Sequence, residues 1–191
     1  MPAAGLWLGL ALLLSGGGVV DESSFPLGDL DRQAIEAAEP TWGSAAARVE
    51  VDGEAIAALA TVEHGAEVVV FLGTWCPDSA REIPRLWRIL DQLPDPLPFT
   101  VRYVGVDLGL EDPAGEAPAA DISFVPTFVV RREGREVGRV VETPEQSVER
   151  DLQELLSLRP RGGAHGDLQS RPSIRLCSPP CDPFPRWRSR S

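Results

Sequence analysis

One stretch of the chain decides the fold: Val68-Val69-Val70-Phe71-Leu72-Gly73-Thr74-Trp75-Cys76-Pro77-Asp78-Ser79. Its first five residues are apolar and mostly β-branched or aromatic, which is typical of a strand buried on both faces of a parallel or mixed sheet. A helical pattern begins directly after the cysteine. The stretch therefore predicts that Cys76 lies in the turn between the carboxyl end of a strand and the amino terminus of a helix.

A thiol at this position is expected to be reactive. The unpaired N–H groups and the dipole at a helix amino terminus favour an anion, so Cys76 should ionise more readily than a free cysteine. A hydrogen bond from the Ser79 hydroxyl would favour the thiolate further, whereas the Asp78 carboxylate would disfavour it. The sequence leaves this balance open, and we expect a reactive but not extreme thiol.

The segment resembles the active site of the thioredoxin family, whose motif is Trp-Cys-x-x-Cys. Trp75 and Cys76 match that motif, and Ser79 stands where the second cysteine would be. Pro84 lies where the family has its helix-kinking proline, and Val125-Pro126-Thr127-Phe128 resembles the cis-proline loop. The chain is thus similar to thioredoxin-like proteins with a monothiol Cys-x-x-Ser site.

Two further features extend the resemblance to residues 45–158. Gly134 resembles the glycine of the family's hairpin turn. A bacterial thioredoxin-like subgroup is similar to this chain in two stretches, the Trp-Cys-x-Asp-Ser motif and Gly138-Arg139-Val140-Val141-Glu142. The resemblance implies an α/β fold, a thioredoxin-like three-layer sandwich with a central mixed β-sheet flanked by helices. It implies no cofactor and no metal.

The same resemblance implies the site residues. Cys76 and Ser79 would be catalytic, and a groove for an extended peptide would form beside a cis peptide bond at Pro126. The substrate-binding residues would be Trp75, Pro77, Asp78, Val125, Pro126 and Thr127. Trp75 is expected to be a partly exposed lid over the thiol, and Arg81 and Glu82 to lie on a solvated helix face.

Three functional hypotheses follow. The first is a monothiol protein that forms mixed disulfides with protein or low-molecular-weight thiols through Cys76, a thiol–disulfide oxidoreductase without a resolving cysteine. The second is a redox-silent module that binds a peptide or partner in the Pro126 groove. The third is an enzyme whose intermediate is resolved by Cys177 or Cys181. Val70 occupies the place of the family's buried acid, which weakens the case for efficient disulfide reduction.

The remaining pattern alternates strands and helices before a closing hairpin and helix, as in an α/β sandwich. Residues 21–45 form an extension with a short helix, and residues 46–158 form the thioredoxin-like domain. We expect strands at 47–51, 68–72 and 99–107, helices at 53–63 and 79–92, a hairpin at 128–141 and a helix at 144–158, with Asp52 as N-cap of the first long helix.

Charge limits the partners that the domain can bind. The net charge is −11, every basic residue is arginine, and residues 159–191 carry seven arginines against Asp167 and Asp182. The rest of the chain therefore stands at −16. An acidic domain argues against nucleic-acid binding, which needs clustered cations. The expected partners are protein or low-molecular-weight thiols and disulfides.

The two ends of the chain differ from the domain in composition. Residues 5–14 form an apolar run that fits the core of a signal peptide and is too short to span a bilayer. Residues 1–20 are therefore expected to be a signal peptide or a disordered amino terminus, with export to the periplasm predicted and a cytoplasmic location as the alternative. Residues 159–191 are expected to be a disordered Arg/Pro-rich tail, and Cys177 and Cys181 make a poor zinc site.

Overall fold

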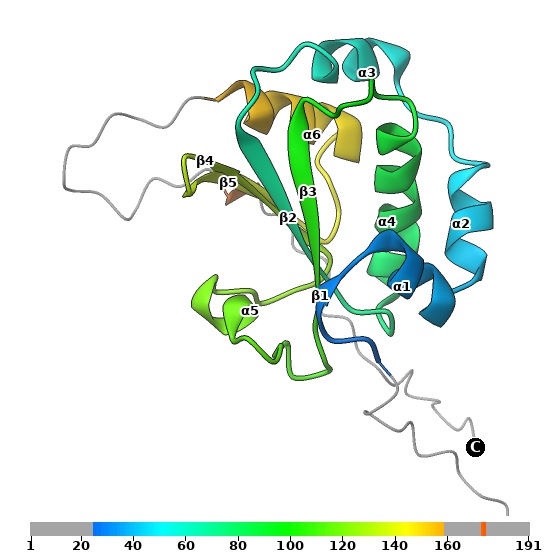
Figure 1. The fold of residues 1–191 in the computed structure, drawn as a ribbon, viewed down its shortest axis with the longest axis vertical. Helices are drawn as coiled ribbons and strands as arrows, with labels where there is room; N and C mark the ends of the chain where they lie inside the picture. The colour runs from blue at the N-terminus through cyan, green and yellow to red at the C-terminus, as the bar shows by residue number, and fades with distance from the viewer. Residues whose placement is uncertain (1–24, 159–172, 175–191) are drawn as a thin grey trace, which may run out of the picture.

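The computed structural model describes residues 25–158 and 173–174 (Figure 1). Its elements are, in order, β1 (Gly28–Leu30), α1 (Arg32–Ala38), α2 (Thr41–Ala46), α3 (Gly53–Leu59), β2 (Ala66–Leu72), α4 (Pro77–Leu90), β3 (Phe99–Gly105), α5 (Glu116–Ala119), β4 (Thr127–Arg132), β5 (Arg135–Val141), α6 (Val148–Ser157) and β6 (Ser173–Ile174).

The strands form one mixed sheet in the order β1-β3-β2-β4-β5-β6. The central strand β2 pairs in parallel with β3 and antiparallel with β4, while β4 and β5 form an antiparallel hairpin. The short strand β6 runs parallel to β5, with Ile174 level with Val140. The sheet and its flanking helices confirm the expected α/β fold, a thioredoxin-like sandwich.

Strand β2 is buried on both faces, as its apolar run predicts. Val68, Val70 and Leu72 belong to a large core under α1, α2, α3, α4 and α6. Val69 and Phe71 point to a smaller core on the opposite face. Because successive side chains of a strand alternate between the faces of its sheet, one continuous apolar run supplies both cores.

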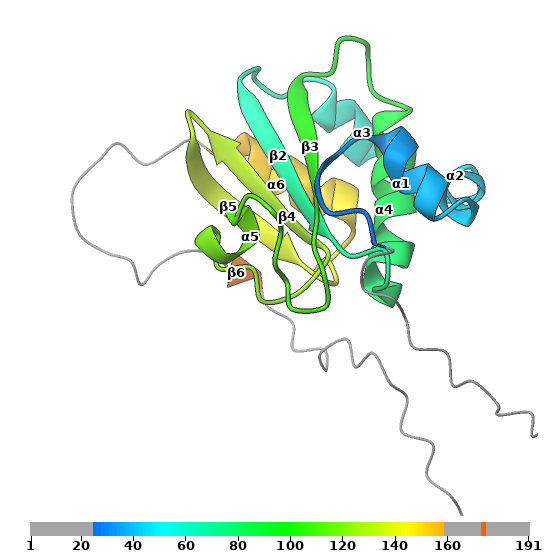
Figure 2. The ribbon, with the colours of Figure 1, turned by 60° about the horizontal axis from the view of Figure 1, so that its bottom comes forward.

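The two layers that cover the sheet are unequal. Five helices lie against one face, and the short α5 with its neighbouring loops covers the other (Figures 1 and 2). In the thick layer, the rings of Trp42 in α2 and Trp87 in α4 have their centroids 6.2 Å apart. The thin layer is the one that contains Cys76, Val106 and Val125.

The amino-terminal part of the sheet differs from the expectation. The strand expected at 47–51 does not form; residues 41–46 are α2, and the segment after it has no regular structure. The edge of β3 is instead occupied by β1, with Asp29 opposite Val104. The Val51 side chain packs against the large core although its segment pairs with no strand. An apolar residue flanked by polar ones therefore does not indicate a strand here.

Element ends shift by a few residues from the sequence-based ranges. The first long helix ends at Leu59, α4 begins at Pro77, and α6 begins only at Val148, after a Ser147 cap. Asp52 caps α3 as expected, since its Oδ1 accepts hydrogen bonds from the backbone N–H groups of Glu54 and Ala55 at 2.9 and 3.2 Å. Helix α5 (Glu116–Ala119) lies between β3 and β4, where the sequence-based ranges contain no helix.

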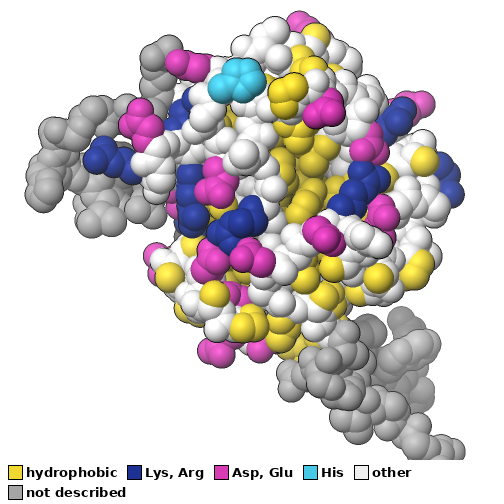
Figure 3. Space-filling view, in the orientation of Figure 1, with side chains coloured by type: hydrophobic (Ala, Val, Ile, Leu, Met, Phe, Trp, Pro, Cys, Tyr) yellow, Lys and Arg dark blue, Asp and Glu magenta, His cyan; other side chains and the backbone are white. Residues whose placement is uncertain are grey.

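The arginine side chains on the face in Figure 3 lie beside acidic ones and do not gather in a basic patch. Arg102 shows the pattern in detail. Its guanidinium donates to Asp29 at 2.6 Å and to Glu116 at 2.9 and 2.5 Å, joining β3 to β1 and α5. No helix in the described part of the chain is long and apolar enough to cross a bilayer.

The contact between β1 and β3 generates a stability prediction. A Cβ atom on Gly105 would lie 2.2 Å from the Pro26 carbonyl oxygen, which is backbone and cannot move alone. Gly105→Ala should therefore lower the free energy of unfolding by about 1–3 kcal/mol in urea denaturation. Gly53→Ala, whose Cβ would meet no atom within 4 Å, is the control and should not be destabilised. Equal stability of the two variants would contradict the packing of the segment before β1 against β3.

Candidate functional site

Cys76 occupies the N-cap position of α4, directly after β2. Its backbone is extended, with φ −89° and ψ 125°, and Pro77 follows as the first helical residue. The Cys76 carbonyl accepts a hydrogen bond from Ala80 N–H at 3.0 Å, and its own N–H donates to Gly73 at 3.0 Å. The prediction of a thiol between a strand end and a helix amino terminus is confirmed.

The sulfur of Cys76 is buried against the proline loop. The residue is 1% exposed, and its S–H group donates to the Val125 carbonyl at 3.1 Å. The Val125–Pro126 peptide bond is cis, as the resemblance implies. The thiol and this loop are therefore in direct contact. The burial of the sulfur contrasts with the reactive thiol that the sequence predicts, because a reactive thiol must be reached by its reaction partner.

Ser79 lies in the first turn of α4 and is fully buried. Its hydroxyl has no hydrogen-bond partner among the described residues, so the expected bond to the Cys76 sulfur is not formed. The thiol hydrogen of Cys76 points to the Val125 carbonyl instead. In this state of the site, Ser79 does not assist the sulfur.

Arg81 connects the start of α4 to the segment after β5. Its guanidinium donates to Asp78 at 2.5 Å, to Glu82 at 2.6 Å and to the Thr143 hydroxyl at 3.0 Å. Glu82 is only 4% exposed, so the expectation of a solvated face is wrong for it. A carboxylate is tolerated there because Arg81 and the nearby Arg85 offset the loss of hydration.

Trp75 is fixed over the site by two features of its surroundings. Its indole Nε1–H donates to the Val106 carbonyl at 3.1 Å, and the side chain is half-buried, as expected for a lid. The ring also lies close to Gly73, where a Cβ atom would stand 2.5 Å from Cε2 of Trp75. Glycine is required at position 73 for the indole to lie where it does.

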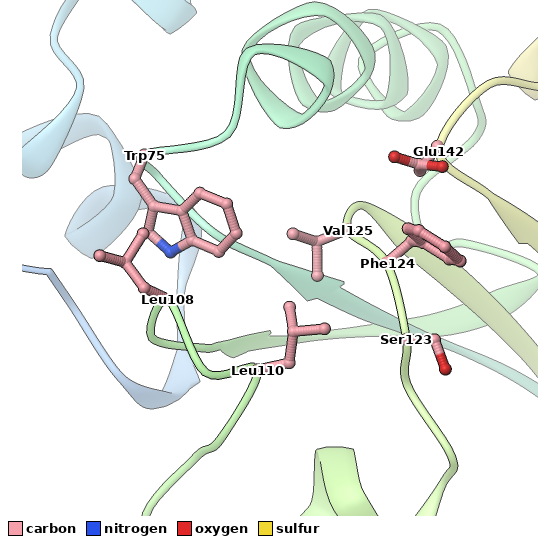
Figure 4. A pocket seen from close by; sticks show the side chains of 7 residues that line it. All are labelled: Trp75, Leu108, Leu110, Ser123, Phe124, Val125 and Glu142. Carbon is pink, nitrogen blue, oxygen red and sulfur yellow. The ribbon is translucent and has the colours of Figure 1, made fainter. Parts of the chain in front are cut away.

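A cavity of about 140 Å³ opens beside Trp75 and the proline loop (Figure 4). Its lining residues are Trp75, Leu108, Leu110, Ser123, Phe124, Val125 and Glu142. Of the expected substrate-binding residues, Trp75 and Val125 line it. Pro77 is exposed on α4, Asp78 pairs with Arg81, and Pro126 and Thr127 are buried, with the Thr127 hydroxyl donating to the Phe124 carbonyl at 2.7 Å.

Sequence reasoning missed five of these lining residues, and Glu142 is the most unusual of them. Glu142 is 3% exposed, and its backbone N–H donates to the Pro126 carbonyl at 2.7 Å. Its φ is +53°, a conformation in which a side chain is disfavoured. Leu110, with φ +63°, is a second such residue in the lining. Neither backbone conformation can be read from the sequence. The resemblance of residues 138–142 to a thioredoxin-like subgroup does not indicate that Glu142 lines a cavity.

The part of the chain that the structure describes holds no group of three or more His, Cys, Asp or Glu side chains suited to a metal ion. Cys76 is the one cysteine in that part of the chain. Cys177 and Cys181 lie outside the described residues, and so does the apolar run near the amino terminus. The hypothesis of a resolving tail cysteine therefore stays a prediction.

The chain therefore has a thioredoxin-like α/β fold, with Cys76 beside a cis-proline loop. The chain is 25% identical over 88 residues to the protein named "Thioredoxin-3, mitochondrial" of Saccharomyces cerevisiae, a match that covers 46% of this chain and 64% of that protein. The chain thus spans less than two thirds of this relative. No family model matches the chain.

Two solved structures are also similar to the chain. One is a protein of unknown function from Pseudomonas aeruginosa, 19% identical, with a TM-score of 0.44 over 63% of this chain and 71% of that chain. The other is an HIV epitope scaffold, 17% identical, with a TM-score of 0.46 over 68% of this chain and 84% of that chain.

The position of Trp75 can be tested with a double-mutant cycle. Gly73→Ala should lower the free energy of unfolding by about 1–3 kcal/mol, because its Cβ would displace the indole and break the bond to Val106. In a Trp75→Ala background the same change should cost much less, since the clashing ring is gone. Additive costs in urea denaturation would show that the indole does not lie against Gly73.

Proposed function

We propose that the protein forms mixed disulfides with protein or low-molecular-weight thiols through Cys76. The observation that carries this proposal is the position of Cys76 at the N-cap of α4, in contact with the loop of cis-Pro126. It places a thiol at a helix amino terminus, where an anion is favoured, beside a loop that borders an apolar cavity. The similarity to thioredoxin supports the same class of chemistry.

The first step is thiol–disulfide exchange. Cys76 loses its proton, and the thiolate attacks one sulfur of a disulfide R–S–S–R′. A new S–S bond joins Cys76 to R–S, the old S–S bond breaks, and R′–S⁻ leaves with the electron pair. The Val125 carbonyl, which accepts the thiol hydrogen before the reaction, is released from that bond when the proton departs.

The second step needs a thiol from outside the site. In a two-cysteine motif the second thiol attacks the intermediate, but Ser79 holds that position and a hydroxyl cannot perform thiol exchange. An external thiolate must attack the sulfur of Cys76 or that of its partner. We therefore propose a long-lived mixed disulfide whose turnover depends on the supply of free thiol.

The burial of the sulfur favours a second candidate function. With Cys76 only 1% exposed, a disulfide reaches the thiol only after a side chain over it moves. A redox-silent module that binds a peptide in the cavity beside Pro126 needs no such movement. The reactivity of the native thiol distinguishes the two candidates.

Thiol reactivity can be measured after Cys177→Ser and Cys181→Ser changes, which leave Cys76 as the sole thiol. We expect the folded protein to react with an aromatic disulfide near neutral pH faster than it unfolds, because only local movement is needed to expose the sulfur. The measurements are the rate of probe release and the unfolding rate under the same conditions. Reaction no faster than global unfolding would favour the redox-silent module.

A second variant tests why the intermediate persists. Ser79→Cys places a thiol in the first turn of α4, where it can attack the Cys76 mixed disulfide and release R–S⁻. We expect this variant to release a bound thiol without added reductant, whereas the parent retains it. Ser79→Ala is the matched control and should retain it too. Mass spectrometry after removal of excess probe measures the retained fraction; spontaneous release from the parent would refute the proposed role of Ser79.

A further inference from the structure

Two segments flank the residue whose carbonyl accepts the thiol hydrogen of Cys76. Figure 4 shows Trp75 and Glu142 on opposite sides of the cavity, with Val125 between them. Cys76 does not line this cavity and is 1% exposed, so the cavity gives no open path to the sulfur. Access to the thiol therefore requires that a segment beside Val125 moves.

The segment on the Glu142 side is held to the start of α4 by a closed circuit of hydrogen bonds. The Glu142 N–H donates to the Pro126 carbonyl at 2.7 Å, one residue along from the carbonyl that Cys76 uses. The next residue, Thr143, accepts a hydrogen bond from the Arg81 guanidinium at 3.0 Å. Because Cys76 is the N-cap of the helix that carries Arg81, this last bond closes the circuit that contains the sulfur.

The bond between Arg81 and Thr143 can break without disturbing the rest of α4. Arg81 also donates to Asp78 at 2.5 Å and to Glu82 at 2.6 Å, so its guanidinium stays anchored on its own helix when Thr143 is released. The Arg81 side chain is 51% exposed, and its bond to Thr143 is exposed as well. Water can replace both partners there, so breaking this bond has a small net cost.

The segment on the Trp75 side is more costly to move. The indole bond to the Val106 carbonyl is partly buried, the ring lies close to Gly73, and the side chain packs against the smaller core. Moving the ring would expose apolar surface to water in addition to breaking the bond. Of the two segments, the one held by Arg81 is therefore expected to open first.

We propose that the bond between Arg81 and Thr143 is a latch that controls the access of disulfides to Cys76. When the latch opens, the segment after β5 moves away from α4, the bond from Glu142 to the proline loop breaks, and the loop is free to leave the sulfur. Arg81 and Thr143 are positioning residues, since they touch no reacting atom and set how often the thiol is reached. The proposal rests on the proposed function, because it describes the regulation of the same thiol.

The test compares Thr143→Val, which removes the hydroxyl and keeps the branched shape, with Thr143→Ser, which keeps the hydroxyl. Both changes are made in protein carrying Cys177→Ser and Cys181→Ser. Thr143→Val should react with an aromatic disulfide roughly two- to tenfold faster than the parent, because the loss of one hydrogen bond raises the population of the open state by that factor. Thr143→Ser should react at the parent rate. An unchanged rate in Thr143→Val would refute the latch.

Thr61→Val is the matched control. The Thr61 hydroxyl is also exposed, and it donates one hydrogen bond, to the Ala58 carbonyl at 2.9 Å, in a segment that follows α3 and does not line the cavity. The rate of thiol reaction should not change in this variant. Equal acceleration by Thr61→Val and Thr143→Val would show a general loss of stability and would refute a local latch.

Hydrogen exchange separates failure of the latch from failure of the proposed function. The Glu142 N–H should exchange faster in Thr143→Val than in the parent, by a factor similar to the gain in reaction rate, because the same opening exposes it. If Cys76 reacts with no disulfide in any variant, the proposed function falls; faster exchange at Glu142 would then keep the latch as a local opening, and unchanged exchange would remove it as well. If Cys76 of the parent reacts but Thr143→Val alters neither rate, the proposed function stands and the latch is refuted.

Discussion

The structure depends on the burial of β2 on both faces. The apolar run from Val68 to Leu72 supplies Val70 to one core and Phe71 to the other, and a strand buried on both faces in this way lies in the middle of its sheet. Its neighbours β3 and β4 then follow on either side. The chain that leaves β2 enters α4 at Cys76, which is buried in the thin layer.

The proline loop packs against Cys76 within the same thin layer. Strand β4 begins at Thr127 beside Phe71, the next-to-last residue of β2, so the preceding residues are held against the start of α4. One carbonyl of the loop takes the thiol hydrogen of Cys76, and the next takes the N–H of Glu142 at the end of β5. Three segments far apart in the sequence are thus joined through two consecutive peptide groups.

Sequence reasoning predicts the parts of this arrangement that depend on local pattern. The strand before Cys76, its place at the helix start, the hairpin and the Asp52 cap follow from apolar runs, turn residues and capping chemistry, and the cis bond at Pro126 follows from resemblance. The strand order at the edge does not follow, because the pairing of Asp29 with Val104 depends on contacts between distant segments. The same holds for the cavity: the burial of Glu142 and its positive φ are products of tertiary structure.

The burial of Cys76 and its proposed reactivity are compatible once the contacts that cover it are considered. The Trp75 indole is held by a hydrogen bond to the Val106 carbonyl. The loop before Thr127 is held by the hydrogen bond from the Thr127 hydroxyl to the Phe124 carbonyl. A third joins the sulfur itself to Val125. A typical hydrogen bond contributes about 0.5–1.5 kcal/mol net, so an opening that breaks one or two of them costs about 0.5–3 kcal/mol. That cost reduces the population of the open state by between about twofold and 150-fold. A local opening of this size slows exchange without abolishing it, and a peptide whose side chain fills the cavity would repay part of the cost at the moment of binding.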